Sequence, residues 1–371
     1  MLITKNIFNI LKKKKIDFYT GVPDSVLKSF SLDLKNLNNK KHIIAANEGG
    51  AVSIATGYYL ATSKIPVVYF QNSGLGNIIN PITSIVHKDV YSIPMIFFIG
   101  WRGAPGIQDE VQHKVQGKIM LKQLKLLKIK YKIFNKNKYK EQLNSLVSIT
   151  KKDNHPVAFL FKNKDLDTNF KKTKFVRDKK TNSVTRSIFI SELLNQSKNS
   201  RIVATTGFTS RELLQIRKTG KNNKSKDFYM VGGMGHSLSV AAGFALHSKK
   251  KIFCLDGDGS VLMHLGSIRT AGYLNNSNFK HIILNNNAHE SVGGQTTMAD
   301  GIDFKRLSKS LGYKNFFQIK KNNQIKPILK KFIFSNGPNL LEVKIKKKTL
   351  QTLARPKNLQ RIKKQFMNRN D

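Results

Sequence analysis

The feature that most constrains this chain of 371 residues is an apolar run that ends in Gly257-Asp258-Gly259. An amphipathic stretch over 260–274 follows it, and a second apolar run, 281–284, leads into asparagines. The pattern predicts a strand at 251–255, a helix and a second strand. Since a right-handed crossover returns the chain to the same edge of a parallel sheet, Asp258 and Asn286 are expected to lie side by side there.

The carboxyl edge of an open α/β sheet is where such folds bind ligands. Gly257 and Gly259 let the backbone approach phosphate oxygens, and the next helix presents free N–H groups to an anion. Mg²⁺ prefers oxygen ligands, which the Asp258 carboxylate, the Asn286 amide and the Ala288 carbonyl can supply. These residues predict a diphosphate and magnesium site. The alternative is an ordinary turn followed by loop asparagines.

Strands and helices are predicted to alternate along two halves of the chain. The strand-like runs are 16–20, 42–45, 66–70, 93–99, 130–134 and 156–161, then 201–204, 227–231, 251–255, 281–285, 315–319 and 340–345. Residues 166–185 have little periodicity and are predicted to link a first domain, 1–165, to a second, 186–371. This alternation is typical of α/β domains, so each half is expected to be a parallel sheet covered by helices on both faces.

The net charge of +43 raises the possibility of nucleic-acid binding. However, only 11 of the 65 basic residues are arginine, which is the residue best suited to bidentate phosphate contacts. The lysines are spread along the whole chain together with many asparagines. We therefore expect a compositional bias on solvated surfaces and no specific nucleic-acid partner.

The location of the protein is also constrained by its sequence. No stretch of eighteen apolar residues occurs, which argues against a membrane span and a membrane partner. Residues 2–11 are interrupted by polar side chains and make a poor signal peptide. The single cysteine, Cys254, lies in a predicted core strand, which excludes a disulfide framework. We expect a cytoplasmic protein.

The segment Gly257-Asp258-Gly259-Ser260 and the later asparagines resemble the cofactor signature of thiamine diphosphate enzymes. The resemblance implies thiamine diphosphate and Mg²⁺ as cofactors, with all four residues of that segment at the diphosphate. It also implies a catalytic glutamate on a separate domain that hydrogen-bonds the aminopyrimidine ring. Glu48, which begins a helix rich in small residues, stands where that glutamate belongs. The alternative is a solvated glutamate that the helix dipole favours.

The glycine-rich run 231–237 resembles the segment that supports the bent cofactor in this family. The resemblance implies cofactor contacts from Gly233, Met234 and His236, with Met234 as the wedge. The alternative is a glycine-rich turn in which Met234 fills the core. In this family the first half is the pyrimidine-binding domain and the second binds the diphosphate and Mg²⁺. The site then lies at a subunit interface of a homo-oligomer, a dimer or higher.

A narrower resemblance, to phosphonopyruvate decarboxylases, covers nearly all of the chain. It is carried by Tyr19–Ser25, Gln71–Asn77, Gly100–Gly103 with Asp109–His113, Ala288–Gln295 and Leu353–Pro356. Two positions depart from the pattern, because Asn287 stands where glycine is usual and Glu290 where aspartate is usual. Asparagine tolerates positive φ, so the turn at Asn287 can survive. The longer Glu290 side chain can alter the geometry of the site.

This resemblance also implies roles for residues of the first half and for two histidines. The implied substrate-binding residues are Asp24, Ser25, Asn72, Gly74, Asn77 and Arg102. His113 and His289 are implied as catalytic proton carriers, since imidazole titrates near neutrality. Alternatively, both histidines are merely solvated, and Asp24 caps a helix that starts near Ser25.

The implied reaction is the decarboxylation of 3-phosphonopyruvate to phosphonoacetaldehyde and CO₂ in phosphonate biosynthesis. It would proceed through the thiamine diphosphate ylid, whose thiazolium ring accepts the electrons that CO₂ leaves behind. The substrate is then a small anionic 2-keto acid. A sulfopyruvate decarboxylase shares every cofactor argument and is the main alternative. Another thiamine diphosphate-dependent decarboxylase or carboligase ranks lower, and a noncatalytic basic binding protein is the alternative from another class.

Overall fold

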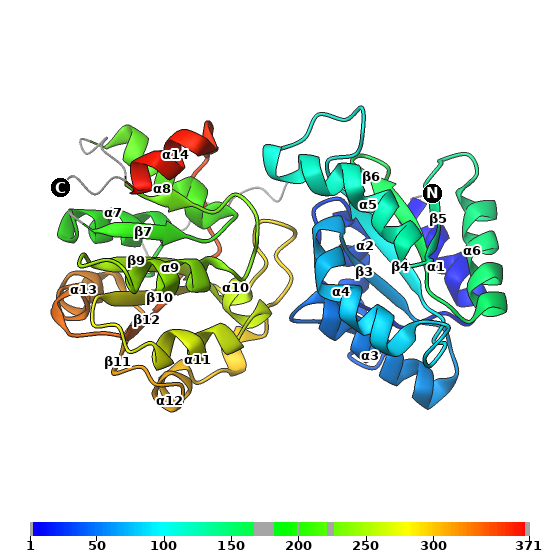
Figure 1. Ribbon diagram of the computed structural model, residues 1–371, viewed down its shortest axis with the longest axis horizontal. Helices are drawn as coiled ribbons and strands as arrows, with labels where there is room; N and C mark the ends of the chain where they lie inside the picture. Colours follow the sequence, from blue (N-terminus) through cyan, green and yellow to red (C-terminus); the bar gives the residue numbers. More distant parts are fainter. Residues whose placement is uncertain (1–2, 167–181, 199, 221–225, 368–371) are drawn as a thin grey trace. The chain divides into compact units, whose positions relative to one another are not determined.

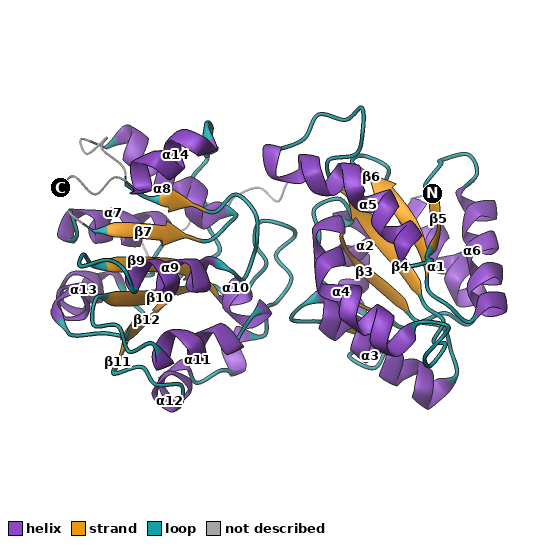
Figure 2. Ribbon diagram, viewed as in Figure 1, coloured by secondary structure: helices purple, strands orange, loops and turns teal. Residues whose placement is uncertain are grey.

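The computed structural model describes residues 3–166, 182–198, 200–220 and 226–367, which form two compact units. The first unit contains the described residues up to 166 together with Val292–Gln295, and the second contains the other described residues. Each unit has a six-stranded sheet in which every pair of neighbouring strands is parallel (Figures 1 and 2). The predicted α/β fold with two parallel sheets is confirmed. The domain boundaries remain a prediction, and most of the predicted linker, 167–181, lies outside the described residues.

The first sheet has the strand order β2-β1-β3-β4-β6-β5. Its strands are β1 (Tyr19–Gly21), β2 (His42–Ile44), β3 (Val67–Gln71), β4 (Ile96–Trp101), β5 (Lys130–Ile133) and β6 (Val157–Lys162). Every residue of β4 is buried. This explains why a continuous apolar run marks this strand in the sequence, since a parallel strand with helices on both sides has no solvent face.

Helices cover both faces of the first sheet (Figure 2). One face packs against α1 (Ile3–Lys13), α2 (Lys28–Asp33) and α6 (Tyr139–Asp153). The other face packs against α3 (Glu48–Thr62), α4 (Leu75–Pro81) and α5 (Lys114–Leu126). The Asn47 side chain accepts a hydrogen bond from the Gly50 amide at 2.8 Å and thereby caps α3. This cap places Glu48 in the first turn of α3, directly after β2.

The second sheet has the strand order β11-β12-β10-β9-β7-β8. Its strands are β7 (Arg201–Ala204), β8 (Phe228–Tyr229), β9 (Ile252–Gly257), β10 (Phe279–Asn285), β11 (Asn315–Ile319) and β12 (Asn339–Lys344). In both sheets, each predicted strand is present with ends that differ by a few residues. The central position of β9 and β10 brings their carboxyl ends to the middle of one sheet edge.

Helices also cover both faces of the second sheet (Figure 1). One face packs against α7 (Arg186–Gln196), α8 (Phe208–Thr219) and α13 (Ile325–Phe334). The other packs against α9 (Ser237–Ala245), α10 (Asp258–Met263), α11 (Gly266–Tyr273), α12 (Phe304–Ser310) and α14 (Leu359–Met367). Within the described parts of the chain, no helix combines the length and apolar content needed to cross a membrane.

The prediction of a single helix over 260–274 is wrong, because α10 and α11 are separate helices. The chain leaves the helical conformation at His264, which has φ −134° and ψ 57°. The His264 ring stacks on that of His236 with the ring centroids 4.5 Å apart. The break therefore turns this side chain onto the glycine-rich run, and amphipathic periodicity alone does not reveal such a local contact.

Candidate functional site

The register of β9 and β10 determines which residues meet at the edge of the second sheet. Leu284 pairs with Gly257, so the asparagines that end β10 lie beside the start of α10. The Ala288 amide donates to Asn286 Oδ1 at 3.1 Å and also hydrogen-bonds the Asp258 carboxylate. The structure thus brings together Asp258, Asn286 and Ala288, the three residues predicted to hold a metal.

Asp258 is buried, and this burial raises the pKa of its carboxyl group. Hydrogen bonds from Thr297 Oγ1 at 2.5 Å and from the Gly259 and Ala288 amides oppose that rise. A carboxylate, an amide oxygen and a carbonyl at one place suit a hard cation such as Mg²⁺. The sequence analysis missed Thr297, because a lone threonine in a distant loop carries no pattern.

The glycine-rich run is bonded to the Gly-Asp-Gly segment through Ser260. The Ser260 hydroxyl accepts from the Gly235 amide at 3.1 Å and contacts Thr205 Oγ1 at 3.0 Å. Gly233 and Gly235 have φ of +65° and +88°, a region that favours glycine. Met234 is half-buried and His236 is exposed. The predicted cofactor-binding residues of this run therefore lie next to those of the Gly-Asp-Gly segment.

The loop after β10 is held by the side chain of Asn287. Its Oδ1 atom accepts from the Ala299 amide at 3.0 Å and from Thr296 and Thr297 hydroxyls. Asn287 has φ +50°, as expected for asparagine where glycine is usual. His289 lies over Gly259, where a methyl group would approach its Cε1 atom to 2.9 Å. Burial lowers the pKa of His289 to about 4, so its imidazole is neutral at pH 7.

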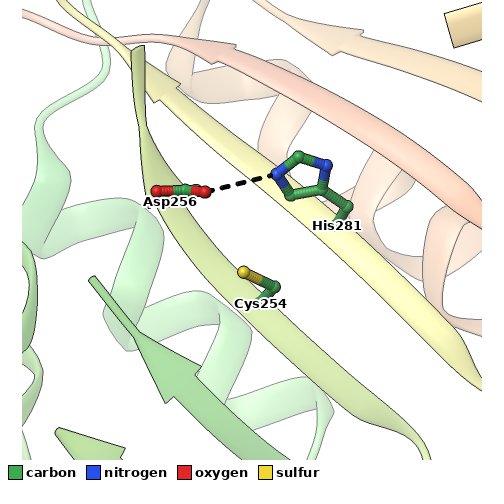
Figure 3. A group of neighbouring side chains, drawn as sticks. All are labelled: Cys254, Asp256 and His281. Carbon is green, nitrogen blue, oxygen red and sulfur yellow. Dashed lines mark ion pairs between the residues drawn. The ribbon is translucent and has the colours of Figure 1, made fainter. Parts of the chain in front are cut away.

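A buried polar cluster lies under this edge and was not identified in the sequence analysis. Cys254, Asp256 and His281 have potential ligand atoms within 4.8 Å of one another (Figure 3). However, Asp256 Oδ1 already accepts from Ser237 Oγ and from the Gly257 amide, both at 3.0 Å. Asp256 Oδ2 lies 3.8 Å from His281 Nε2. We interpret the cluster as a network that joins β9, α9 and β10.

In the first unit, Glu48 is packed closely among residues of its own domain. It is buried, and desolvation raises the pKa of its carboxyl group. Asn77 Nδ2 donates to Glu48 Oε2 at 2.6 Å, which partly opposes that rise. A methyl group at Gly74 would overlap the Glu48 carboxyl group. Gly74 and Asn77, predicted as substrate-binding residues, are thus placed against Glu48.

Arg102 organises the loops that follow β1, β3 and β4. Its guanidinium forms a bidentate pair with Asp109, at 2.7 Å from Nε and 2.5 Å from Nη2, and Nη1 donates to Ser25 Oγ at 2.9 Å. Its backbone exchanges two hydrogen bonds with the Asn72 amide side chain. Although burial alone would raise the pKa of Asp109, the hydrogen bonds from Arg102 and the Gly103 amide hold it below its ordinary value.

Asp24 is buried next to this arginine cluster. Its Oδ2 atom accepts from the Val26 and Leu27 amides at 3.0 Å, and Oδ1 has no hydrogen-bond partner among the described residues. Desolvation raises the pKa of Asp24 to about 6. The helix expected to start near Ser25 begins at Lys28 instead. The Asp24 carboxylate thus holds the turn before α2 and keeps one oxygen free.

His113 lies in the loop that leads into α5. A methyl group at Gly103 would overlap the His113 carbonyl, so this loop packs closely against the end of β4. Burial and the nearby Arg102 lower the pKa of His113 to about 4. His113 is therefore neutral at pH 7, like His289, and neither imidazole titrates near neutrality as the sequence analysis expected.

Comparison with known proteins identifies both halves of the chain. Residues 1–126 match the family "Thiamine pyrophosphate enzyme, N-terminal TPP binding domain", and residues 205–343 match "Thiamine pyrophosphate enzyme, C-terminal TPP binding domain". The chain is 30% identical to phosphonopyruvate decarboxylase of Streptomyces hygroscopicus over 352 residues, which cover 91% of this chain and 86% of the relative. It is 29% identical over 354 residues to that of Streptomyces viridochromogenes, covering 91% and 87%.

A sulfopyruvate decarboxylase is also similar over most of the chain. The protein of Methanosarcina acetivorans is 25% identical over 350 residues, which cover 88% of this chain and 87% of the relative. The predicted resemblance to thiamine diphosphate enzymes is confirmed by both family matches. The chain belongs to the family of thiamine diphosphate-dependent decarboxylases that includes phosphonopyruvate decarboxylase.

Proposed function

We propose that this protein decarboxylates 3-phosphonopyruvate to phosphonoacetaldehyde and CO₂ in phosphonate biosynthesis. The observation that carries the proposal is the 30% identity to a phosphonopyruvate decarboxylase over 91% of the chain. The two phosphonopyruvate decarboxylases match the chain over slightly more residues and at higher identity than the sulfopyruvate decarboxylase of Methanosarcina acetivorans does. The reaction breaks the bond between the carboxylate carbon and the keto carbon, and a proton takes the place of the lost CO₂.

Glu48 is the proposed catalytic residue. The bound cofactor would supply the electron sink for the electron pair that the departing CO₂ leaves behind. A buried carboxyl group with a raised pKa can hold a proton and exchange it with a ring nitrogen of the aminopyrimidine. Asn77 fixes the orientation of this carboxyl group by its hydrogen bond at 2.6 Å. These contacts support a role in activating the cofactor.

The arginine cluster of the first unit is the proposed substrate-binding region. A substrate with a carboxylate and a phosphonate requires hydrogen-bond donors that orient both groups. Arg102 is hydrogen-bonded to Ser25 and Asn72, and its positive charge is balanced by the Asp109 carboxylate. The Arg102–Asp109 pair has no net charge, so it attracts anions weakly at long range. Its N–H groups can still donate hydrogen bonds to a substrate in defined directions. This supports Ser25, Asn72 and Arg102 as substrate residues. Asp24 is a further proposed substrate residue, and the neutral His113 and His289 are the proposed proton carriers.

Mg²⁺ is the proposed metal of the second unit. The oxygen atoms of Asp258, Asn286 and Ala288 would be its protein ligands, and diphosphate oxygens would complete an octahedral shell. Burial raises the pKa of Asp258, and a nearby divalent cation would stabilise its ionised form.

We also propose a homo-oligomer whose active site uses residues from two subunits. Val111, Val115 and Ile119 follow one another at intervals of four residues and are 54%, 69% and 37% exposed. Residues four apart lie on one face of a helix, so they form an apolar stripe along α5 and the turn before it. Such a stripe supports burial against another subunit.

The decisive experiment is an assay of the purified protein with Mg²⁺, thiamine diphosphate and, in turn, phosphonopyruvate, sulfopyruvate and pyruvate. We expect aldehyde and CO₂ from phosphonopyruvate at a kcat/KM well above that for the other two acids. The Glu48→Gln variant should lose most of this activity. Aldehyde from sulfopyruvate alone would make the sulfonate the substrate, which is the alternative that the Methanosarcina acetivorans relative supports.

A further inference from the structure

Glu290 contacts two of the three proposed metal ligands, both in the loop after β10. Its carboxylate oxygen Oε2 accepts from Asn286 Nδ2 at 2.9 Å. Its backbone N–H donates to the Ala288 carbonyl at 2.8 Å. One residue therefore contacts both the amide side chain and the backbone carbonyl that would face the cation.

These contacts determine which way the Asn286 amide points. The Nδ2 group faces a carboxylate, and Oδ1 faces the Ala288 N–H at 3.1 Å. Turning the amide by 180° would place an oxygen against a carboxylate and an NH₂ group against an N–H, so both hydrogen bonds would be lost. Only the observed orientation satisfies both neighbours, and in it Oδ1 accepts from the same Ala288 N–H as the Asp258 carboxylate.

Glu290 is itself held by a buried ion pair. Arg186, the first residue of α7, donates from Nη2 to Glu290 Oε2 at 2.7 Å and from Nη1 to Glu212 Oε1 at 3.0 Å. The Arg186 and Glu212 side chains are 5% and 1% exposed. A guanidinium between two carboxylates has a fixed plane, so the position of Glu290 is set by helices α7 and α8.

We propose that Arg186 and Glu290 are positioning residues that orient Asn286 and Ala288 toward the divalent cation. This inference rests on the proposed function, in which these groups bind Mg²⁺. Groups that hold metal ligands in place commonly change metal affinity by about 10- to 100-fold when removed. Arg186 keeps its pair with Glu212 if Glu290 is truncated, so the fold is expected to survive that change.

The test is the Mg²⁺ dependence of thiamine diphosphate binding, measured by calorimetry on the full-length protein. We expect Glu290→Ala to raise the Mg²⁺ concentration for half-maximal binding by about 10- to 100-fold, with binding restored by excess Mg²⁺. Glu290→Gln retains an acceptor for Asn286 and should show a smaller rise. Circular dichroism of each variant establishes that it is folded.

Glu342→Gln is the matched control. Glu342 is buried and accepts from Asn285 Nδ2 at 2.8 Å, so it holds the preceding asparagine in the same manner. Its replacement should leave the half-maximal Mg²⁺ concentration unchanged. A folded Glu290→Ala protein with wild-type Mg²⁺ dependence would overturn the inference while the proposed function stands. Failure of the wild-type protein to bind the cofactor at any Mg²⁺ concentration would overturn both.

Discussion

The carboxyl group of Glu48 occupies a space that only glycine at position 74 leaves free. Gly74 has φ −80°, which any residue can adopt, so its backbone does not require glycine. The requirement is steric, because a methyl group there would overlap the Glu48 carboxyl group. The Asn77 hydrogen bond at 2.6 Å completes this arrangement. The orientation of Glu48 thus depends on two neighbours, Gly74 and Asn77.

Two glycine-to-alanine changes separate this steric role from a general effect on the loop. Gly74→Ala should lower kcat/KM by roughly 10- to 100-fold, because a displaced catalytic group loses its alignment. Gly76→Ala is the control, since a methyl group there has open space and alanine favours a helix. Steady-state kinetics of both variants at saturating cofactor measures the difference. Equal kcat/KM values in the two variants would contradict the role of Gly74.

Asp24 gives a pH-dependent prediction. Burial raises the pKa of its carboxyl group to about 6, so the folded protein binds this proton more tightly than the unfolded chain does. Stability from this group is therefore present at low pH and is lost as the pH rises from about 4 to above 6. Asp24→Asn should raise the free energy of unfolding at pH 8 by up to about 3 kcal/mol and change it little at pH 4. Urea unfolding at both pH values measures this.

The exposed Asp33 supplies the control for this experiment. Asp33→Asn removes the same charge from the same region of the chain without relieving burial. If Asp24→Asn raises the free energy of unfolding by the same amount at pH 4 and pH 8, ionisation of Asp24 does not cause the rise. Activity of Asp24→Asn should fall, since stability at a binding site is often gained at the expense of function.

At the scale of elements, the Asp256 network connects three segments that lead to the proposed cofactor site. Asp256 is the second-to-last residue of β9, Ser237 ends the glycine-rich run and begins α9, and His281 lies on β10, which leads to Asn286. The carboxylate contacts all three segments. His281 Nδ1 is also held, by the Tyr313 hydroxyl at 3.1 Å. The relative positions of the strand ends and of α9 therefore depend on one buried acid.

Replacing Asp256 tests this connection. Asp256→Ala leaves buried donors on Ser237 and Gly257 without their acceptor, which should cost roughly 2–5 kcal/mol of unfolding free energy. Asp256→Asn keeps one acceptor oxygen and should cost less. Both variants should raise the KM for thiamine diphosphate. Equal destabilisation by the two changes would contradict the role of Asp256 in the network. A zinc ion bound to the purified protein in a 1:1 ratio would instead identify Cys254, Asp256 and His281 as a metal site.

The sequence predicts those features that follow from periodicity and topology. Buried parallel strands are continuous apolar runs, and their alternation with helices indicates where the carboxyl ends meet. This is why sequence reasoning alone places Asp258 and Asn286 side by side. The break at His264 could not be predicted, because it depends on stacking against His236 from another segment.

The missed site residues have a common cause. Thr297, Asp256 and Arg186 each act through partners that are distant in the chain, and a single residue in a loop, strand or helix start carries no periodic pattern. Such contacts are set by tertiary packing. The roles of the individual site residues remain predictions that the experiments above address.

For the whole molecule, the formal charge of +43 is expected to affect how fast an anionic substrate is attracted more than which substrate is chosen. A basic surface attracts an anionic 2-keto acid, although salt screens this attraction beyond about 8–10 Å. In the proposed function, recognition then depends on the short-range contacts of Arg102 and its neighbours. The same charge opposes association of subunits, so an oligomer requires apolar contacts such as the stripe at Val111, Val115 and Ile119.

The proposed sharing of each active site between two subunits predicts complementation between inactive variants. Glu48→Gln and Asp258→Asn should each be nearly inactive alone. In a mixed dimer, one site receives the intact Glu48 of one chain and the intact Asp258 of the other, while the second site has both defects. Such a dimer should retain about half of the wild-type activity. Coexpression with two different affinity tags, followed by purification on both, isolates it for a kcat measurement.

A mixed oligomer of two differently tagged Glu48→Gln chains is the control and should remain inactive. If Glu48 and Asp258 of the same chain served one cofactor, each site of the mixed dimer would lack one of the two residues. Activity would then stay at the level of the single variants. Because this outcome depends only on which chain supplies each residue, it distinguishes a shared site from a self-contained one whatever the arrangement of the two units.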